Sequence, residues 1–101
     1  MESIESLLKF TSEYPQVENN ALKYSFTGGV AIRLNQEISG YNPKREMSDI
    51  DIVTLDNSIK YPVHSFYLGG YITDSLSSKE ILNYICEAKI KDEKIYFMDG
   101  A

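Results

Sequence analysis

The chain is poor in cysteine, in basic charge and in long apolar runs, and each shortage excludes a class of protein. Cys86 is the only cysteine, so no disulfide can form within the chain. Fifteen acidic against ten basic residues argue against a general nucleic-acid clamp, because affinity for phosphate backbones comes mainly from clustered Lys and Arg. No stretch approaches the roughly 18 apolar residues of a membrane span. We therefore expect a soluble, cytoplasmic protein with no membrane partner and no strong general binding of nucleic acid.

Several sequence motifs of ligand-binding proteins are also missing. Neither the P-loop pattern G-x-x-x-x-G-K-[ST] nor the dinucleotide pattern G-x-G-x-x-G occurs. A calcium-binding EF-hand that began at Asp49 would need glycine where Thr54 stands and glutamate where Lys60 stands. Any phosphate or metal site must therefore be built in another way.

The composition that remains is that of an ordinary globular domain. Hydrophobic residues make up 43% of the chain and charged residues 25%, well away from disordered compositions. A length of 101 residues suffices for one domain and is too short for two. An active site must come from this single core or be completed by another chain.

The first half of the sequence gives helix and strand signals on either side of a glycine pair. Apolar side chains recur at helical spacing in residues 2 to 13. Residues 24 to 27 have the β-branched and aromatic content of a brief strand, which ends at the turn Gly28-Gly29. Apolar spacing then predicts a helix that starts just after the glycine pair and ends near Gly40.

The second half predicts three strands and one helix. Residues 48 to 55 give the strongest strand signal, and residues 61 to 68 fit an outer or edge strand because Pro62 lacks a ladder donor. A capping-box spacing followed by an apolar face predicts a helix over residues 78 to 88. Residues 94 to 98 predict a final strand. Together these elements predict one α/β (α+β) domain, in which a small mixed β-sheet is flanked by helices.

Asp49 and Asp51 are the residues most suited to carry chemistry. Two carboxylates at positions i and i+2 of a strand project from one face and attract a divalent cation, and hard oxygen ligands suit Mg²⁺ or Mn²⁺. The glycine pair at a helix start offers free N–H groups and the positive end of the helix dipole to phosphate oxygens. A phosphate site thus precedes a metal site. The plainer alternative, in which the two acids form only the solvated face of an edge strand, stays open.

Two segments of the sequence resemble a known family when they are taken together. The run Phe26-Thr27-Gly28-Gly29-Val30-Ala31, a helix, and the run Ser48-Asp49-Ile50-Asp51-Ile52-Val53 resemble the signature of the polymerase-β-like nucleotidyltransferase superfamily. The resemblance covers residues 24 to 56, and Arg45 with Ser48 makes it most similar to the AbiEii-type branch.

The resemblance implies a nucleotidyltransferase-like core that moves a nucleoside monophosphate from an NTP to an unidentified acceptor, which could be RNA, a protein or a small molecule. It implies a nucleotide-binding group formed by Thr27, Gly28, Gly29 and Ser48. It also implies that the catalytic acids Asp49 and Asp51 bind Mg²⁺ or Mn²⁺. Phosphoryl-type transfer needs positioning and charge neutralisation more than a dedicated nucleophile, which agrees with this set of residues.

The superfamily usually carries a third metal-binding carboxylate on a later strand. The first candidate for that place is Asp99, and Asp92 and Glu93 lie before the predicted final strand. Residues 94 to 98 hold no acid in their middle, so Asp99 lies at the far end of the predicted final strand. The sequence also stops directly after this strand. We therefore expect a domain that is truncated or completed by a partner, and an exposed final strand that could pair with a second copy in a homodimer.

Three hypotheses about function follow. The first is an Mg²⁺-dependent nucleotidyltransferase. The second is a catalytically silent nucleotidyltransferase-like module that binds a nucleotide or a partner protein, for example as half of a toxin–antitoxin pair. The third is a small α/β protein without such a site.

Four further residues receive ordinary interpretations. His64 is interpreted as a half-buried or surface histidine rather than a catalytic base, and no role is assigned to it. Cys86 is interpreted as a buried, inert thiol on the helix over residues 78 to 88. Lys44 and Arg45 are interpreted as a solvated loop, with the steering of a triphosphate as the alternative.

Overall fold

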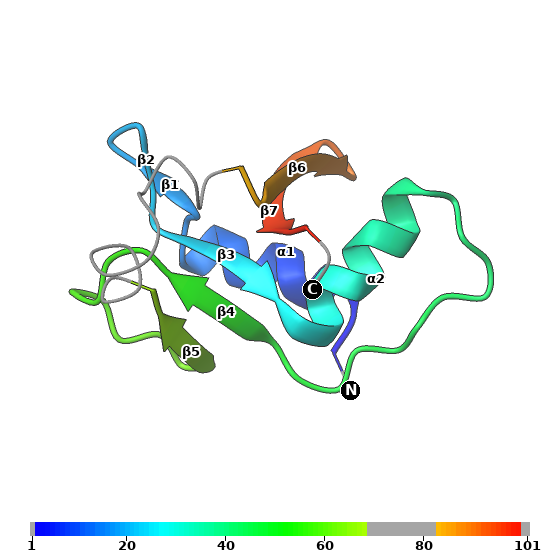
Figure 1. Ribbon diagram of the computed structural model, residues 1–101, viewed down its shortest axis with the longest axis horizontal. Helices are drawn as coiled ribbons and strands as arrows, with labels where there is room; N and C mark the ends of the chain where they lie inside the picture. Colours follow the sequence, from blue (N-terminus) through cyan, green and yellow to red (C-terminus); the bar gives the residue numbers. More distant parts are fainter. Residues whose placement is uncertain (1, 69–82, 100–101) are drawn as a thin grey trace.

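The computed structural model describes residues 2–68 and 83–99, and Figure 1 shows how their helices and strands are arranged. Five strands form a mixed sheet in the order β5-β4-β3-β7-β6, and β1 and β2 form a separate hairpin. In chain order the elements are α1 (Ile4–Glu13), β1 (Val17–Glu18), β2 (Ala21–Leu22), β3 (Tyr24–Thr27), α2 (Gly28–Ile38), β4 (Asp51–Thr54), β5 (His64–Tyr67), β6 (Ile85–Ile90) and β7 (Glu93–Met98). The expected fold class, a small mixed sheet flanked by helices, is confirmed.

Helix α1 forms where the apolar spacing predicted it. Ser3 caps its start, since the Ser3 hydroxyl accepts a hydrogen bond from the N–H of Ser6 at 3.2 Å. Ile4, Leu7 and Phe10 follow at intervals of three residues and are all buried, so one face of the helix supplies the core.

Strand β3 is the centre of the sheet and has two different neighbours. It runs antiparallel to β4, with Tyr24 opposite Thr54 and Thr27 opposite Asp51. It runs parallel to β7 through the pair Phe26 and Phe97. Beyond β4, the edge strand β5 runs parallel to β4. The carboxyl end of β3 and the amino ends of β4 and β5 therefore lie at the same end of the sheet.

The core lies on the face of the sheet that carries Phe26, Ile52 and Phe97. These three side chains are neighbours in the ladder and are fully buried. Cross-strand partners point to the same face, and both helices add to the same cluster, α1 with Leu7 and α2 with Leu34. Burying each large apolar side chain stabilises the fold by about 1.5–3 kcal/mol.

Gln16 ties β7 to the segment that leads into β3. Its side-chain Nε2 donates to the carbonyl of Tyr96 at 2.8 Å, and its Oε1 accepts from the N–H of Tyr96 at 3.0 Å. The Gln16 side chain is buried, and the ladder between β3 and β7 contains only the pair Phe26 and Phe97. The amide of Gln16 thus satisfies backbone groups that a longer ladder would have paired.

The predicted helix over residues 78 to 88 is wrong for its C-terminal part. Residues 85–88 belong to strand β6, and residues 78–82 lie outside the described residues. From Cys86 to Ile90 apolar and charged residues alternate with the period of a strand, and β6 turns into β7 at Lys91-Asp92, both with positive φ. Cys86 accordingly lies on a strand and is only partly buried.

The final strand was predicted correctly but its exposure was not. Strand β7 spans Glu93–Met98 and lies between β3 and β6, so it is an interior strand of the sheet. It has no free edge for a second copy, and that route to a homodimer is wrong. The outer strands of the sheet are β5 and β6.

Two other segments differ from the sequence-based expectations. Residues 17–22 form the β1–β2 hairpin where only a loop was expected, with Asn19 and Asn20 at positive φ in its turn. Strand β4 is shorter than the predicted span 48 to 55 and begins at Asp51, while the predicted edge strand 61 to 68 is present as β5. In the part of the chain that the structure describes, no helix has the length and apolar character to cross a membrane.

Gln16→Leu should destabilise the fold, because it leaves the backbone N–H and carbonyl of Tyr96 unsatisfied in a buried setting. We expect a loss of about 1–3 kcal/mol in the free energy of unfolding, measured by urea denaturation. The matched control is Gln36→Leu, which removes one hydrogen bond at an exposed position. Equal losses for the two variants would contradict this role of Gln16.

Candidate functional site

Gly28 joins β3 to α2 in a conformation that favours glycine. Its φ is +62°, in the left-handed region, and Thr27 before it is extended. A Cβ atom on Gly28 would lie 2.9 Å from the carboxylate Oδ2 of Asp51. The missing side chain therefore lets the start of α2 and the carboxylate of Asp51 approach one another closely.

The N-terminus of α2 has no acidic residue of its own, although the carboxylate of Asp51 on β4 lies beside it. Thr27 is the N-cap residue but its side chain makes no capping hydrogen bond, and the first turn contains no Asp or Glu. The partial positive charge of the helix end is therefore not neutralised from within α2, and its first N–H groups suit an anion. Helix α2 begins at Gly28 itself, about two residues earlier than the expected start just after the glycine pair.

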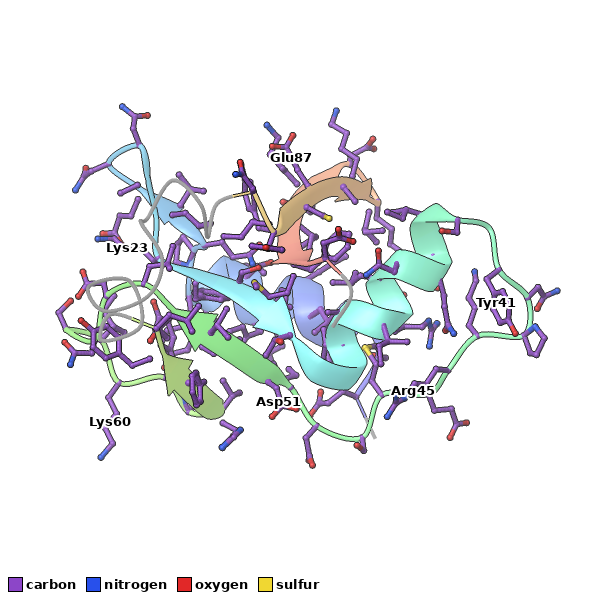
Figure 2. All side chains as sticks on the ribbon, in the orientation of Figure 1. Lys23, Tyr41, Arg45, Asp51, Lys60 and Glu87 are labelled. Atoms are coloured by element: carbon purple, nitrogen blue, oxygen red, sulfur yellow. The ribbon has the colours of Figure 1, made fainter. Side chains whose placement is uncertain are left out.

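Arg45 adds a cation next to the same helix end. Its guanidinium Nη2 would lie 3.6 Å from a Cβ atom on Gly29. The backbone of Arg45 is fixed to α2, because its N–H donates to Oε1 of Gln36 at 2.6 Å and its carbonyl accepts from Nη1 of Arg33 at 3.1 Å. Figure 2 shows Arg45 on the loop that returns from the far end of α2.

Asp51 is the first residue of β4 and is set between two other strands. It lies opposite Thr27 of β3 on one side and beside His64 of β5 on the other. The Nδ1 atom of His64 is 3.2 Å from Oδ1 of Asp51, within hydrogen-bond distance. About a third of the Asp51 side chain is exposed, and most of the His64 side chain is exposed. Both groups are thus open to a ligand.

A hollow of about 520 Å³ lies at this end of the sheet, beside Asp51. Figure 2 labels Asp51 at the start of β4. It is lined by Glu2, Asp49, Ile50, Asp51, Pro62, Val63 and His64. Glu2 is held there because its N–H donates to the carbonyl of the buried Met47 at 3.1 Å. The lining contains three acidic residues and no Lys or Arg, and this excess of negative charge favours a cation in the hollow.

Asp49 lines this hollow from a loop position and not from the strand on which the sequence predicted it. The two acids were expected to alternate on one strand, but Asp49 lies in the irregular, exposed segment before β4. The expectation of a shared strand face is therefore wrong, because the chain turns at Asp49 before it enters the sheet. Ser48 precedes Asp49 in the same exposed segment.

Asp99 lies on the other side of β3. It follows β7, and its N–H donates to the carbonyl of Tyr84 at 2.6 Å. Burial, together with the nearby carboxylate of Asp99, raises the pKa of the Cys86 thiol, which places this carboxylate beside β6. Across residues 2–68 and 83–99, no three His, Cys, Asp or Glu side chains converge closely enough to hold a metal ion alone.

The carboxylates that line the hollow nevertheless fit a divalent cation whose other ligands are waters or phosphate oxygens. Asp49 and Asp51 supply hard carboxylate oxygens to the hollow, and a Cβ atom at Gly28 would fill space next to Oδ2 of Asp51. Such cations commonly bind through one or two carboxylates together with waters and substrate phosphates. The site thus suits a metal that arrives with a phosphate ligand.

A second, larger hollow of about 650 Å³ lies between the start of α1, α2 and β6. Four of its charged side chains are paired within it, Lys91 with Glu5 and Arg33 with Glu37. It lacks a glycine turn, so the hollow at Asp51 is the stronger candidate.

Sequence reasoning missed the contribution of His64 and Glu2 to this site. His64 was given no role, and nothing in its spacing relative to Asp51 reveals the contact. Only the parallel register of β4 and β5, across a connection of nine residues between Thr54 and His64, sets the two side chains together. Glu2 lies at the hollow because it forms an isolated β-bridge with Met47, which no sequence pattern predicts.

Comparison with known proteins does not add to these observations. A scan against protein-family models, a search of curated proteins and a search of solved structures find no match to the chain.

Gly28→Ala should cost more stability than Gly40→Ala, although both glycines have positive φ. Backbone strain alone should cost about 1–2 kcal/mol at either position. A Cβ at Gly40 meets nothing within 4 Å, whereas at Gly28 it meets Asp51. In an Asp51→Ala background the difference between the two glycine variants should shrink, as measured by urea denaturation. Equal costs in the otherwise unchanged protein would refute the close approach.

Glu37→Gln should reduce the acid sensitivity of the fold. The hydrogen bond from Lys44, and next that from Arg33, hold the pKa of Glu37 below its ordinary value. Because the folded-state pKa is lowered, this stabilisation is present above the ordinary value and is lost as the pH falls through the folded-state pKa. Unfolding free energies measured down to about pH 3 should fall less steeply for Glu37→Gln than for the control Glu13→Gln. Equal slopes would show that the contacts of Glu37 contribute nothing.

Proposed function

We propose that this chain carries the nucleotide- and metal-binding half of a nucleotidyltransferase-like domain. In this proposal it moves a nucleoside monophosphate from an NTP to an acceptor hydroxyl, as the resemblance to the polymerase-β-like superfamily and its AbiEii-type branch implies. The observation that carries the proposal is the close approach of the Gly28 turn to Asp51. It brings the N-terminus of α2, which suits an anion, next to a carboxylate at one end of the sheet.

The α2 N-terminus and Arg45 support the phosphate part of this proposal. Free N–H groups at Gly28 and Gly29 suit phosphate oxygens, and the Arg45 guanidinium lies close to the same turn. Thr27 lies opposite Asp51, and Ser48 lies just before the hollow, so both are near enough to be helpers. The triphosphate would lie between the helix end and the acids.

Asp49 and Asp51 support the metal part. They would hold Mg²⁺ or Mn²⁺, which supplies charge neutralisation when bound with the nucleotide. In the transfer, the acceptor oxygen forms a bond to the α-phosphorus while the bond from that phosphorus to the bridging oxygen breaks. Pyrophosphate leaves, and the proton of the acceptor hydroxyl passes to solvent or a nearby carboxylate. The chain's own residues position and orient the phosphates for this displacement.

A second candidate is a catalytically silent module with the same binding site. The lining of the hollow favours it, because Asp99, the candidate third carboxylate, is not among the residues that line it. Such a module would bind the nucleotide or a partner protein without transferring a phosphoryl group. The two candidates share the binding step and differ only in the chemical step.

The binding step can be tested by calorimetric titration with a non-hydrolysable NTP, with and without Mg²⁺ or Mn²⁺. We expect metal-dependent binding that falls by about tenfold or more in Asp51→Asn, the usual scale for groups that order a metal site. The control is Asp56→Asn, an acid at the other end of β4 that pairs with Lys23. Undiminished binding by Asp51→Asn would refute both candidates.

The chemical step can be tested with NTPs radiolabelled at the α-phosphate, incubated with total RNA, protein extract or the chain alone. Transfer of label by the unchanged protein supports the enzyme, and Asp51→Asn should slow that transfer by at least about a hundredfold, because metal charge stabilisation is worth several kcal/mol. Binding without any transfer supports the silent module. Equal transfer by the protein and by Asp51→Asn would overturn the proposed role of this acid.

A further inference from the structure

Among the side chains that line the hollow in front of Asp51, the proposed function gives no role to the imidazole of His64. The residue directly beside Asp51 on the neighbouring strand is this histidine rather than an acid, because β4 and β5 run parallel with Asp51 paired to His64. Asp49 lines the same hollow. His64 lies on an outer strand and is largely exposed, so its ring is free to meet a ligand.

The spacing of the two facing atoms matches that of two ligands on one metal ion. Nδ1 of His64 and Oδ1 of Asp51 are 3.2 Å apart. Two ligands at adjacent corners of an octahedron, each about 2.1 Å from the metal, lie about 3.0 Å from one another. A cation could therefore replace the hydrogen bond between these atoms with little movement of either strand.

We propose that His64 binds the divalent cation together with Asp51, and that the site consequently takes Mn²⁺ in preference to Mg²⁺. This inference rests on the nucleotide and metal site of the proposed function. Nδ1 of His64 and Oδ1 of Asp51 occupy neighbouring ligand positions, and phosphate oxygens, water or Asp49 take the others. His64 is thus a metal ligand that sets the choice of ion.

The preference follows from the chemistry of the ligands. Mg²⁺ binds almost entirely through oxygen atoms and gives up its waters reluctantly, so a nitrogen ligand in its shell is unfavourable. First-row transition ions accept imidazole readily, and Mn²⁺ among them also suits carboxylate and phosphate oxygens. A set of one imidazole and one or two carboxylates beside a triphosphate therefore favours Mn²⁺.

The composition of the chain allows an unambiguous spectroscopic test, because His64 is its only histidine. The tag-free protein is loaded with Mn²⁺ and a non-hydrolysable NTP, and pulsed electron paramagnetic resonance measures nitrogen nuclei coupled to the metal. We expect a coupling from a directly bound nitrogen that changes to the heavy-isotope pattern when the protein is made with heavy-nitrogen histidine. This substitution separates His64 from the nitrogens of the nucleotide base and requires no mutation.

Two variants test the same role of His64 through the affinities for Mn²⁺ and Mg²⁺. His64→Gln should abolish the histidine coupling and weaken Mn²⁺ binding by about tenfold or more, while Mg²⁺ binding changes much less. Ser65→Ala, the next residue on the same exposed strand, should leave both affinities and the coupling unchanged.

The outcomes separate this inference from the function on which it rests. Binding of Mn²⁺ and nucleotide without histidine coupling overturns the role of His64 and leaves the proposed function standing. Histidine coupling without any effect of nucleotide supports the metal ligand and overturns the nucleotide site. If the protein binds no Mn²⁺ with or without nucleotide, or binds Mg²⁺ more tightly than Mn²⁺, the inference is overturned.

Discussion

The approach of Gly28 to the carboxylate of Asp51 is the contact on which the candidate site depends. Gly28 has a left-handed backbone, and a single Cβ there would lie 2.9 Å from Oδ2 of Asp51. The antiparallel register of β3 and β4 places Thr27 opposite Asp51, so the turn after β3 and the start of β4 coincide. The N-terminus of α2, which attracts anions, and the carboxylate of Asp51, which attracts cations, are thereby held next to each other.

Two groups of opposite charge surround this contact and are held by different parts of the fold. Arg33 and Gln36 on α2 fix the backbone of Arg45, and Glu37 pairs with Lys44, so the loop of basic residues is fastened to the helix. Glu2, Asp49 and Asp51 gather in the hollow on the other side. A chain with net negative charge thus presents a local cation next to the helix end, which suits a small phosphate ligand accompanied by a metal rather than a long nucleic acid.

The interior position of β7 bears on catalysis as well as on assembly. The carboxylate of Asp99 lies beside Cys86 and does not line the hollow, although the parallel pairing of β3 with β7 brings it to the same end of the sheet as the Gly28 turn. Asp51 instead has His64 as its neighbour on the opposite side. The groups at this end of β4 are therefore three acids and a histidine, and Asp99 is not among them.

Local signals in the sequence determined the elements whose neighbours lie close in the chain. The apolar spacing of α1, the aromatic run of β3 and the glycine turn into α2 were predicted, and so was the mixed class of the sheet, because each depends on propensity and periodicity within a few residues. The pair Asp49 and Asp51 was also found, although the reason given for it, a shared strand face, was wrong. The first residues of β6 were assigned to a helix because Ile85 and Ala88 continue the helical spacing of Ile81 and Leu82 in the sequence, whereas the pairing with β7 makes them part of a strand.

Only the tertiary structure decided which of these elements are neighbours. The contact between His64 and Asp51 depends on the parallel pairing of β4 and β5. The order of the strands decides that Asp99 follows the strand on the other side of β3 from Asp51. Strand pairing is set by which faces can be buried together across long stretches of chain, as with Phe26, Ile52 and Phe97. The spacing of residues along the chain does not reveal which strands pair. The sequence alone therefore predicted the glycine turn and the acids, whereas the packing of the sheet determined which other groups surround them.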